Sequence, residues 1–470
     1  MDKFNQILNS INDFISGLPL VTIILAVGAY FTVRLGFLQI TKLHRALKYA
    51  VTSEGEGKGE VSSFGALCTA LSATIGTGNI VGVATAITMG GPGALLWMWI
   101  AALLGMSTKY AEGVLAIKYR KVCSDGHVLG GPFYYIENGM GRKFKWLAKL
   151  FAIFCLCVGI MGIGTFTQAN GIANAVENFF SNQSQYGVTL FGQHYSYVVI
   201  ITSIVVALLT GLVIIGGLKR IANVSTVVIP VMAVTYFVSC ATILILNAEA
   251  IPSAIKTVVE SAFGLKPAVG GAVGGMFIAM QKGIARGIFS NEAGLGSAPI
   301  AAAAAKTKEP VRQGLVSMTG TFIDTIIICT MTGLCILVTN ANNMGLEGVD
   351  VTIKAFEIGL PFSSTVSSFL LMICLVFFAF TTILGWNYYS ERCLEYLMGG
   401  KNKVVKYYKY IYVFAVFIGP FFTVSAVWTI ADIFNSLMAF PNLIAIIYLS
   451  DVVIRETKDY FRRLKENKDI

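Results

Sequence analysis

Charged side chains are scarce in this sequence. Asp, Glu, Lys and Arg make up 13% of the 470 residues, whereas 55% are hydrophobic. A soluble domain carries about 25% charged residues. The composition therefore excludes an ordinary soluble domain and predicts an integral membrane protein.

Histidine and paired cysteine motifs are also sparse. The three histidines, His44, His127 and His194, lie far apart in the sequence. The nine cysteines stand mostly inside apolar runs, and none forms a CxxC pair. Buried cysteines of this kind behave as small hydrophobic residues, and neither a metal-ligand spacing nor a catalytic triad is visible. We therefore expect no enzyme active site and no cofactor.

Glycine is abundant instead, and it can interrupt helices. Residues 65–82 (GALCTALSATIGTGNIVG) are the clearest example. The stretch is apolar enough to cross a membrane, but each of the two glycines in its centre, Gly76 and Gly78, costs about 1 kcal/mol of helix propensity relative to alanine. A helix broken at membrane depth offers amide groups to anions and loose carbonyls to cations. Close helix packing through small residues is the alternative, and the stretch alone does not decide between them.

Eleven apolar runs approach the roughly 20 residues that a bilayer crossing needs. They lie near 18–36, 64–89, 93–117, 147–176, 197–217, 224–246, 268–304, 312–338, 364–390, 407–427 and 430–454. The first follows a leader that is not basic, so we interpret it as an uncleaved span. The run at 268–304 is longer than one span and rich in glycine, which predicts a second broken helix with its break within 276–283.

The placement of Lys and Arg predicts the topology. The segments 42–58, 118–149, 219–220, 306–312, 392–409 and 455–468 carry 27 of the 35 basic residues. The positive-inside rule makes them cytoplasmic, with the N-terminus outside and the C-terminus inside the cell. Because this excess charge is spread over loops, it forms no basic face for a nucleic acid.

If the first span is set aside, the two broken helices are the first and sixth of ten. Spans that are five apart enter from opposite sides, as in an inverted repeat of five plus five helices, and matched breaks in such repeats mark transporter sites. The predicted organisation is an N-terminal segment at 1–63, repeats at 64–246 and 247–454, and a cytoplasmic tail at 455–470. We find no sequence similarity between the halves.

Polar residues inside the spans suggest ligands. Thr381 and Thr382 either bond to their own helix carbonyls or offer two oxygens to a cation, together with carbonyls from Ser72 and Ile75. Gln168 and Asn170 are costly unless paired.

Those two amides suit either interhelical hydrogen bonds or a zwitterionic ligand. Phe277, Met280 and Trp386 are predicted to wall a small pocket, with ordinary packing as the alternative.

Ionisable residues near the spans give a weaker signal. Lys109 and Glu112 are three residues apart, which favours a local ion pair. We assign no role to the remaining ones, which are Lys282, Arg286, Asp324 and Asp432.

Residues 90–100 read GGPGALLWMWI and lead to Gly105. This segment closely resembles the signature of the alanine or glycine:cation symporter family, apart from Leu96, where that signature usually has Phe. The resemblance continues through SATIGTGNIVG, SNEAGLGSAP and FTTILGW, so it covers essentially the whole chain.

The resemblance implies an all-α fold of the bacterial leucine transporter type, preceded by one extra helix. It implies that Gly76, Thr77 and Gly78 bind the substrate carboxylate. Sodium would be bound by Ser72, Ile75, Thr381 and Thr382. The amino group and side chain of the substrate would be surrounded by Gln168, Asn170, Phe277, Met280, Gln281 and Trp386.

The resulting prediction is a sodium-coupled symporter of alanine, glycine or a similar small neutral amino acid, working by alternating access in the cell membrane. Sodium is the coupling ion, lipid surrounds the chain, and no nucleic acid is expected. The alternatives are proton coupling, amino-acid exchange and a channel. A channel would be expected to repeat one pore motif or to assemble it from subunits.

Overall fold

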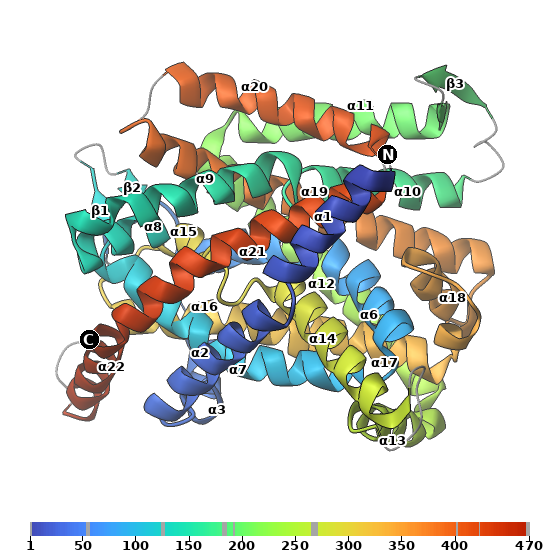
Figure 1. Ribbon diagram of the computed structural model, residues 1–470, viewed down its shortest axis with the longest axis horizontal. Coiled ribbons are helices and arrows are strands. Elements are labelled where there is room, and N and C mark those ends of the chain that lie inside the picture. The colour runs from blue at the N-terminus through green and yellow to red at the C-terminus, as the bar shows by residue number, and fades with distance from the viewer. Residues whose placement is uncertain are drawn as a thin grey trace.

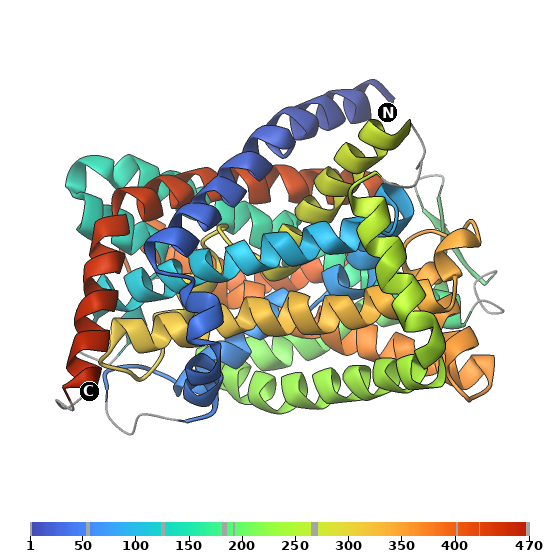
Figure 2. The same ribbon diagram turned by 90° about the horizontal axis from the view of Figure 1, so that it is seen from below.

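The computed structural model describes residues 2–52, 57–123, 127–180, 186–190, 193–264, 271–400, 403–422 and 424–466. The chain forms a bundle of helices, most of which run along the long axis of the molecule (Figure 1). In the second view most helices again run along this axis; the C-terminal helix lies at one end of it, whereas the N-terminal helix lies between its middle and the other end (Figure 2).

The first half of the chain begins with four helices that precede the first break. They are α1 (Asp2–Ile15), α2 (Leu18–Arg34), α3 (Leu38–Thr41) and α4 (Leu43–Val51). The helices that follow are α5 (Ser63–Thr74), η1 (Gly78–Gly82), α6 (Val83–Gly90), α7 (Ala94–Lys118), α8 (Pro132–Tyr135), η2 (Ile136–Met140), η3 (Arg142–Phe144), α9 (Lys145–Met161), α10 (Phe166–Phe179), α11 (Tyr197–Ile214) and α12 (Gly217–Leu246).

The second half continues with η5 (Ala248–Ala250), α13 (Ile251–Ala262), α14 (Gly271–Asn291), α15 (Ala298–Ala302), α16 (Pro310–Thr321), η6 (Phe322–Cys329), α17 (Thr330–Val338), η7 (Ala341–Asn343) and α18 (Val349–Gly359). It ends with α19 (Ser364–Leu397), α20 (Lys403–Ile418), η8 (Gly419–Phe421), α21 (Val424–Tyr448) and α22 (Ser450–Lys465).

Two short antiparallel hairpins qualify the all-α prediction. Strand β1 (Lys121–Val122) pairs with β2 (Val128–Leu129), and β3 (Gly187–Leu190) pairs with β4 (Gln193–Ser196). Both lie between candidate spans, so the membrane part of the described chain is helical.

Seven helices among the described residues are long and apolar enough to cross a membrane, and a bent pair makes up to eight. Helices α2, α14 and α20 lie within the runs at 18–36, 268–304 and 407–427, but they are not among these candidates. The chain is therefore a multi-pass helical membrane protein, while the count of eleven crossings stays a prediction.

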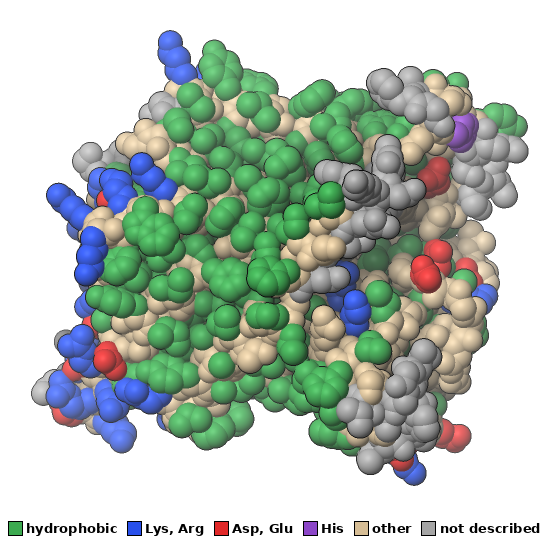
Figure 3. Space-filling model, viewed as in Figure 1, with side chains coloured by type: hydrophobic (Ala, Val, Ile, Leu, Met, Phe, Trp, Pro, Cys, Tyr) green, Lys and Arg blue, Asp and Glu red, His purple; other side chains and the backbone are tan. Residues whose placement is uncertain are grey.

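The surface agrees with this class. Figure 3 shows a broad hydrophobic band, with Lys and Arg side chains gathered at the end where the C-terminus lies. Helix α12, for example, exposes Val227, Val231, Val234 and Ile245. By contrast, most side chains of α7 are buried, so this helix lies inside the bundle.

The first predicted break is present. Helix α5 ends at Thr74, Ile75 is extended with φ −77° and ψ 97°, and the following helical segment turns away by 54°. The break coincides with the glycines that lower helix propensity.

The second break lies elsewhere than predicted. Helix α14 is continuous through 276–283, and the chain leaves it only after Asn291. At Gly283 a Cβ atom would stand 2.2 Å from the Ala94 carbonyl oxygen, so this glycine serves close packing against α7. The break comes at 292–297, where Glu292, Gly294 and Gly296 have φ values of 55°, 85° and 80°.

Labelling can test the predicted orientation of this bundle. Lys143 lies on the exposed surface near the basic end, and Lys256 on α13 has a side chain that is 74% exposed. We expect Lys256→Cys to react with an impermeant thiol reagent in intact cells and Lys143→Cys to need a permeant one. The reverse pattern would invert the topology, and lysed cells, in which both sites should react, provide the control.

Candidate functional site

The first break brings together backbone and side chains from three helices. The Thr382 hydroxyl, on α19, donates to the Ile75 carbonyl oxygen at 3.2 Å and to Phe378 O of its own helix at 3.0 Å. In a continuous helix the Ile75 carbonyl would bond to the Asn79 amide, which instead donates to Gly76 O at 3.3 Å. The break therefore directs a backbone carbonyl toward a hydroxyl of α19.

Two amide groups of the break are satisfied by side-chain carbonyls. The Gly76 amide donates to Asn79 Oδ1 at 2.9 Å, and the Thr77 amide donates to Gln168 Oε1 at 3.2 Å. At Gly76 a Cβ atom would stand 2.5 Å from Thr382 Oγ1, so no larger residue fits without displacing that side chain. The Thr77 hydroxyl is buried and has no hydrogen-bond partner among the described residues.

Asn79 ties the break to a buried carboxylate. Its Nδ2 donates to Asp324 Oδ1 at 2.7 Å, and the hydroxyls of Ser290 and Thr325 donate to Asp324 Oδ2 at 2.9 and 2.7 Å. These residues come from η1, α14 and η6. The sequence alone indicates a functional role for a single Asp inside an apolar run. It does not indicate which three residues bond to that Asp.

The four residues predicted to bind sodium are only partly gathered. Ile75 and Thr382 meet, and the Ser72 hydroxyl lies beside α19, although it donates to Thr69 O at 2.7 Å. Thr381 points to another face, where its hydroxyl bonds to carbonyls of its own helix and contacts Met232 Sδ at 3.8 Å. Consecutive helix residues diverge by about 100°, which explains the separation.

The residues predicted around the amino group and side chain are more scattered. Gln168 is at the first break, whereas Asn170 Nδ2 donates to Phe422 O at 3.3 Å. Phe277 is 49% exposed, because α14 is continuous there and carries it to the surface. Met280 is partly buried. Gln281 lines a cavity between α2, α14 and α21.

Trp386 instead reaches the second break. It is fully buried, and its Nε1 donates to Glu292 Oε1 at 3.0 Å. The other carboxylate oxygen of Glu292 accepts from the Ser297 hydroxyl at 2.6 Å. A non-glycine residue in the left-handed region costs of order 1–3 kcal/mol, and these contacts hold Glu292 there.

Two further buried groups adjoin the second break. Glu112 Oε1 accepts from Asn442 Nδ2 at 2.6 Å, and the same amide donates to Gly294 O at 2.8 Å. The expected Lys109–Glu112 ion pair is not among those that the described residues form. Lys109 is 3% exposed and lies in the field of the carboxylates of Glu112, Glu292 and Asp324.

Comparison with known proteins decides the family. The model of the sodium:alanine symporter family matches residues 1–470. The chain is 43% identical over 473 residues to the sodium/alanine symporter AgcS of Methanococcus maripaludis, covering 99% of both chains. It is 54% identical over 464 residues to an uncharacterized transporter of Haemophilus influenzae (98% and 97% covered) and 38% identical over 464 residues to the probable sodium/glutamine symporter GlnT of Bacillus subtilis (97% and 91% covered).

The chain belongs to the sodium:alanine symporter family. It is thus a transporter rather than an enzyme, and the family implies an amino acid and sodium as its ligands. The resemblance in residues 90–105 and at the two breaks is thereby confirmed at the level of the family, while the individual roles of the site residues remain proposals.

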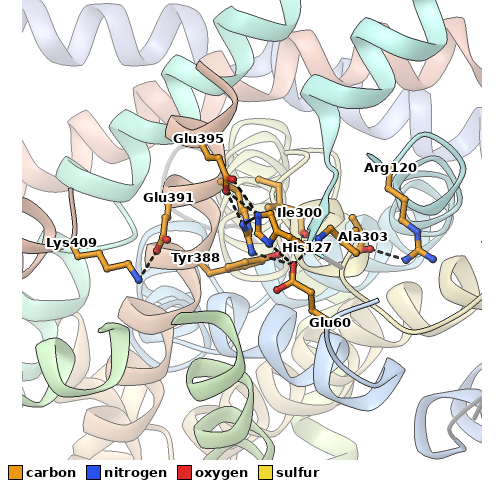
Figure 4. Close-up of polar contacts among 11 residues, drawn as sticks. Glu60, Arg120, His127, Ile300, Ala303, Tyr388, Glu391, Glu395 and Lys409 are labelled. Carbon is orange, nitrogen blue, oxygen red and sulfur yellow. Dashed lines mark hydrogen bonds and ion pairs between the residues drawn. The ribbon is translucent and has the colours of Figure 1, made fainter. Parts of the chain in front are cut away.

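This symporter also holds an ion cluster at its basic end that the sequence did not reveal (Figure 4). His127 lies between two carboxylates, with Nδ1 at 3.0 Å from Glu60 Oε1 and Nε2 at 3.2 Å from Glu395 Oε1. Arg392 contacts His127 and donates to Glu395 Oε2 at 2.7 Å and to Glu60 Oε1 at 3.3 Å. The cluster ties the segment before α5 to hairpin β1–β2 and to α19.

The two members outside the spans have shifted pKa values. Burial lowers the pKa of His127, but hydrogen bonds to Glu395 and Glu60 outweigh it and raise the pKa above the ordinary 6.5. For Glu60, burial raises the pKa, but the His127 bond and the Arg392 charge leave it below the ordinary 4.5. A sequence signal existed only in the charge of each residue, because the four positions are far apart along the chain.

The cluster predicts a pH-dependent contribution to stability. Because folding raises the pKa of His127, this residue stabilises the fold at pH values below the ordinary pKa of 6.5. The effect is lost as the pH rises through the raised pKa. Because folding lowers the pKa of Glu60, this residue stabilises the fold at pH values above the ordinary pKa of 4.5. The effect is lost as the pH falls through the lowered pKa. His127→Gln should therefore lower the melting temperature of the purified protein more at about pH 6 than at about pH 8.

The matched control is His194→Gln, at an exposed position of strand β4, which should change the melting temperature little at either pH. An equal effect of His127→Gln at the two pH values would mean that His127 is not charged in this cluster.

Proposed function

We propose that this protein couples the inward movement of sodium to the uptake of alanine, glycine or a similar small neutral amino acid. The observation that carries the proposal is the meeting of the Ile75 carbonyl and the Thr382 hydroxyl, 3.2 Å apart, at a broken helix. Loose carbonyls and hydroxyls at such a break are a recurring device for binding small cations. The names of the relatives in Methanococcus and Bacillus support sodium as the coupling ion.

The substrate carboxylate is assigned to the other side of the same break, at Gly76, Thr77 and Gly78. The amides of Gly76 and Thr77 now meet neutral side-chain oxygens. A carboxylate makes hydrogen bonds about twice as strong as a neutral acceptor does, so it would displace Gln168 Oε1. The buried Thr77 hydroxyl, which has no partner among the described residues, supplies a further donor.

Sodium and the amino acid then bind to opposite sides of one short backbone segment. An ion that holds Ile75 and Thr382 together stabilises the shape in which the amides of residues 76 and 77 bind the carboxylate. Binding is reciprocal, so the amino acid strengthens sodium binding by the same factor. Alternating access, the five-plus-five repeat and an external N-terminus complete the proposal.

Proton coupling is the second candidate, and the charges of the interior favour it. Glu112, Glu292 and Asp324 are each at most 1% exposed, and Lys109 is the buried cation on which all three act. Buried carboxylates without a matching cation are costly and tend to take up a proton. Protons could therefore replace sodium or accompany it.

Uptake by proteoliposomes tests the function itself. Purified protein should accumulate labelled L-alanine or glycine when an inward sodium gradient is imposed at equal pH. Accumulation driven only by a proton gradient would favour the second candidate, and uptake only into vesicles preloaded with amino acid would favour exchange. Entry that stops once the amino-acid concentration inside the vesicles equals the concentration outside would indicate a channel. L-Glutamine should be included, since one relative is a probable sodium/glutamine symporter.

The two adjacent threonines provide a matched pair for the sodium site. Thr382→Ala removes the hydroxyl that meets Ile75, whereas Thr381→Ala removes one that faces Met232. The hydroxyl oxygen would coordinate the ion, and we take the strength of this contact as similar to that of a hydrogen bond to a charged group, about 1.5–3 kcal/mol. Thr382→Ala should therefore raise the sodium concentration for half-maximal alanine binding by roughly tenfold or more.

Thr381→Ala should leave the sodium dependence close to that of the unsubstituted protein. Equal shifts in the two variants would place the ion between both hydroxyls, and no shift in either would move the coupling ion to another site.

A further inference from the structure

The polar cavity that Gln281 lines lies beside the first break. It has a volume of about 160 Å³ and is lined by side chains of α1, α2, α14 and α21. Its polar lining includes Ser16, Gln281, Lys282, Arg286, Asp432 and Asn435. Figure 3 shows basic side chains set into a recess of this face, which is otherwise mainly hydrophobic.

Opposite charges face each other across the cavity. Lys282 and Arg286 are four residues apart on α14, and so share one helix face. Arg286 Nη1 lies 4.0 Å from Asp432 Oδ1 on α21, and the two side chains are 22% and 24% exposed. A closed charge-assisted hydrogen bond measures about 2.7–2.9 Å, so this pair attracts without forming a closed hydrogen bond.

Asn435 adds an amide that also faces the cavity. It is three residues beyond Asp432 and so lies on the same face of α21. The side chain is only 5% exposed, yet neither Oδ1 nor Nδ2 has a hydrogen-bond partner among the described residues. A buried amide without partners is unfavourable, so this one is well suited to receive a polar ligand.

We propose that the cavity is a second binding site for a small zwitterionic amino acid. The carboxylate of the ligand binds Arg286, whose planar guanidinium matches it, with Lys282 nearby. The ammonium group binds the Asp432 carboxylate and Asn435 Oδ1, and Asn435 Nδ2 donates to the carboxylate. This assignment rests on the proposed function for the class of substrate.

The size of the cavity fits this class. A protein cavity of about 150 Å³ binds benzene, which has six non-hydrogen atoms. Alanine also has six and glycine has five, so either fills the space without moving the helices. A longer amino acid such as glutamine would extend beyond it.

The cavity ends close to the proposed transport site. Phe289 lines it, and the same ring lies 3.4 Å from the position that a Cβ atom would take at Gly78. Arg286 contacts this ring as well, with its Cζ 5.6 Å from the ring centroid. The Phe289 side chain therefore borders both the cavity and the break, and the second site is a waiting position from which an amino acid moves inward when Phe289 turns.

The stoichiometry of L-alanine binding tests the proposal. Equilibrium dialysis of the purified full-length protein at saturating sodium should give two equivalents of alanine per chain. Arg286→Gln and Asn435→Leu should each leave one, because they remove a ligand of the cavity and none of the break. The control Ile278→Ala, on the surface of the same helix, should keep two.

Competitors separate a zwitterion from other ligands. Propionate and ethylamine each carry one end of alanine, so each should displace alanine from the cavity at least tenfold less well than glycine does. If inorganic phosphate or phosphatidylglycerol vesicles displaced it and ethylamine did not, the cavity would be an anion or lipid-headgroup site and the proposal would be wrong.

A labelling measurement covers the case in which the cavity variants do not fold. Ala285 lines the cavity, so alanine should slow the reaction of Ala285→Cys with a thiol reagent and leave Ile278→Cys unaffected. If the unsubstituted protein bound only one equivalent of alanine, and alanine did not slow the reaction of Ala285→Cys with the thiol reagent, the second site alone would be overturned. No binding of alanine, glycine or L-glutamine at all would overturn the proposed function and the cavity with it.

Discussion

Backbone groups inside a membrane must find partners within the protein, and the rest of this structure follows from that requirement at residues 75–79. Once the helix is broken there, each freed group needs a side chain from another helix. Thr382 meets the Ile75 carbonyl, Gln168 meets the Thr77 amide, and Asn79 folds back on Gly76. The same demand that makes a break costly positions the polar atoms that a cation and a carboxylate would use.

Buried carboxylates hold both breaks in place. Asp324 fixes Asn79 beside the first break, and Glu292 joins Trp386 and Ser297 at the second. Such groups remain charged only if donors or cations surround them, and Lys109 is the buried cation that faces them. Because the balance of charge is uneven, any conformational change that moves these carboxylates also changes how favourably a cation binds near them.

The glycines show where prediction from sequence succeeded and where it failed. Gly76 and Gly283 both stand in glycine-rich apolar runs, and both were expected to mark breaks. Gly76 does lie in a break, just after α5 ends at Thr74, and a Cβ atom there would collide with Thr382 Oγ1. At Gly283 the helix continues, because close contact with the Ala94 carbonyl repays the lost propensity. Propensity alone does not separate these cases, since the outcome depends on what the neighbouring helix presents.

The sequence by itself determined that this is a helical membrane protein, which family it belongs to, and that a helix is broken near Gly76. These follow from composition and from contiguous motifs, which need no knowledge of packing. Only the tertiary structure decided that Thr382 rather than Thr381 faces Ile75, that the second break comes after Asn291, and that Arg286 and Asp432 share a cavity. Those features depend on which way each helix face turns and on contacts between residues far apart in the chain, and neither is written in any local pattern.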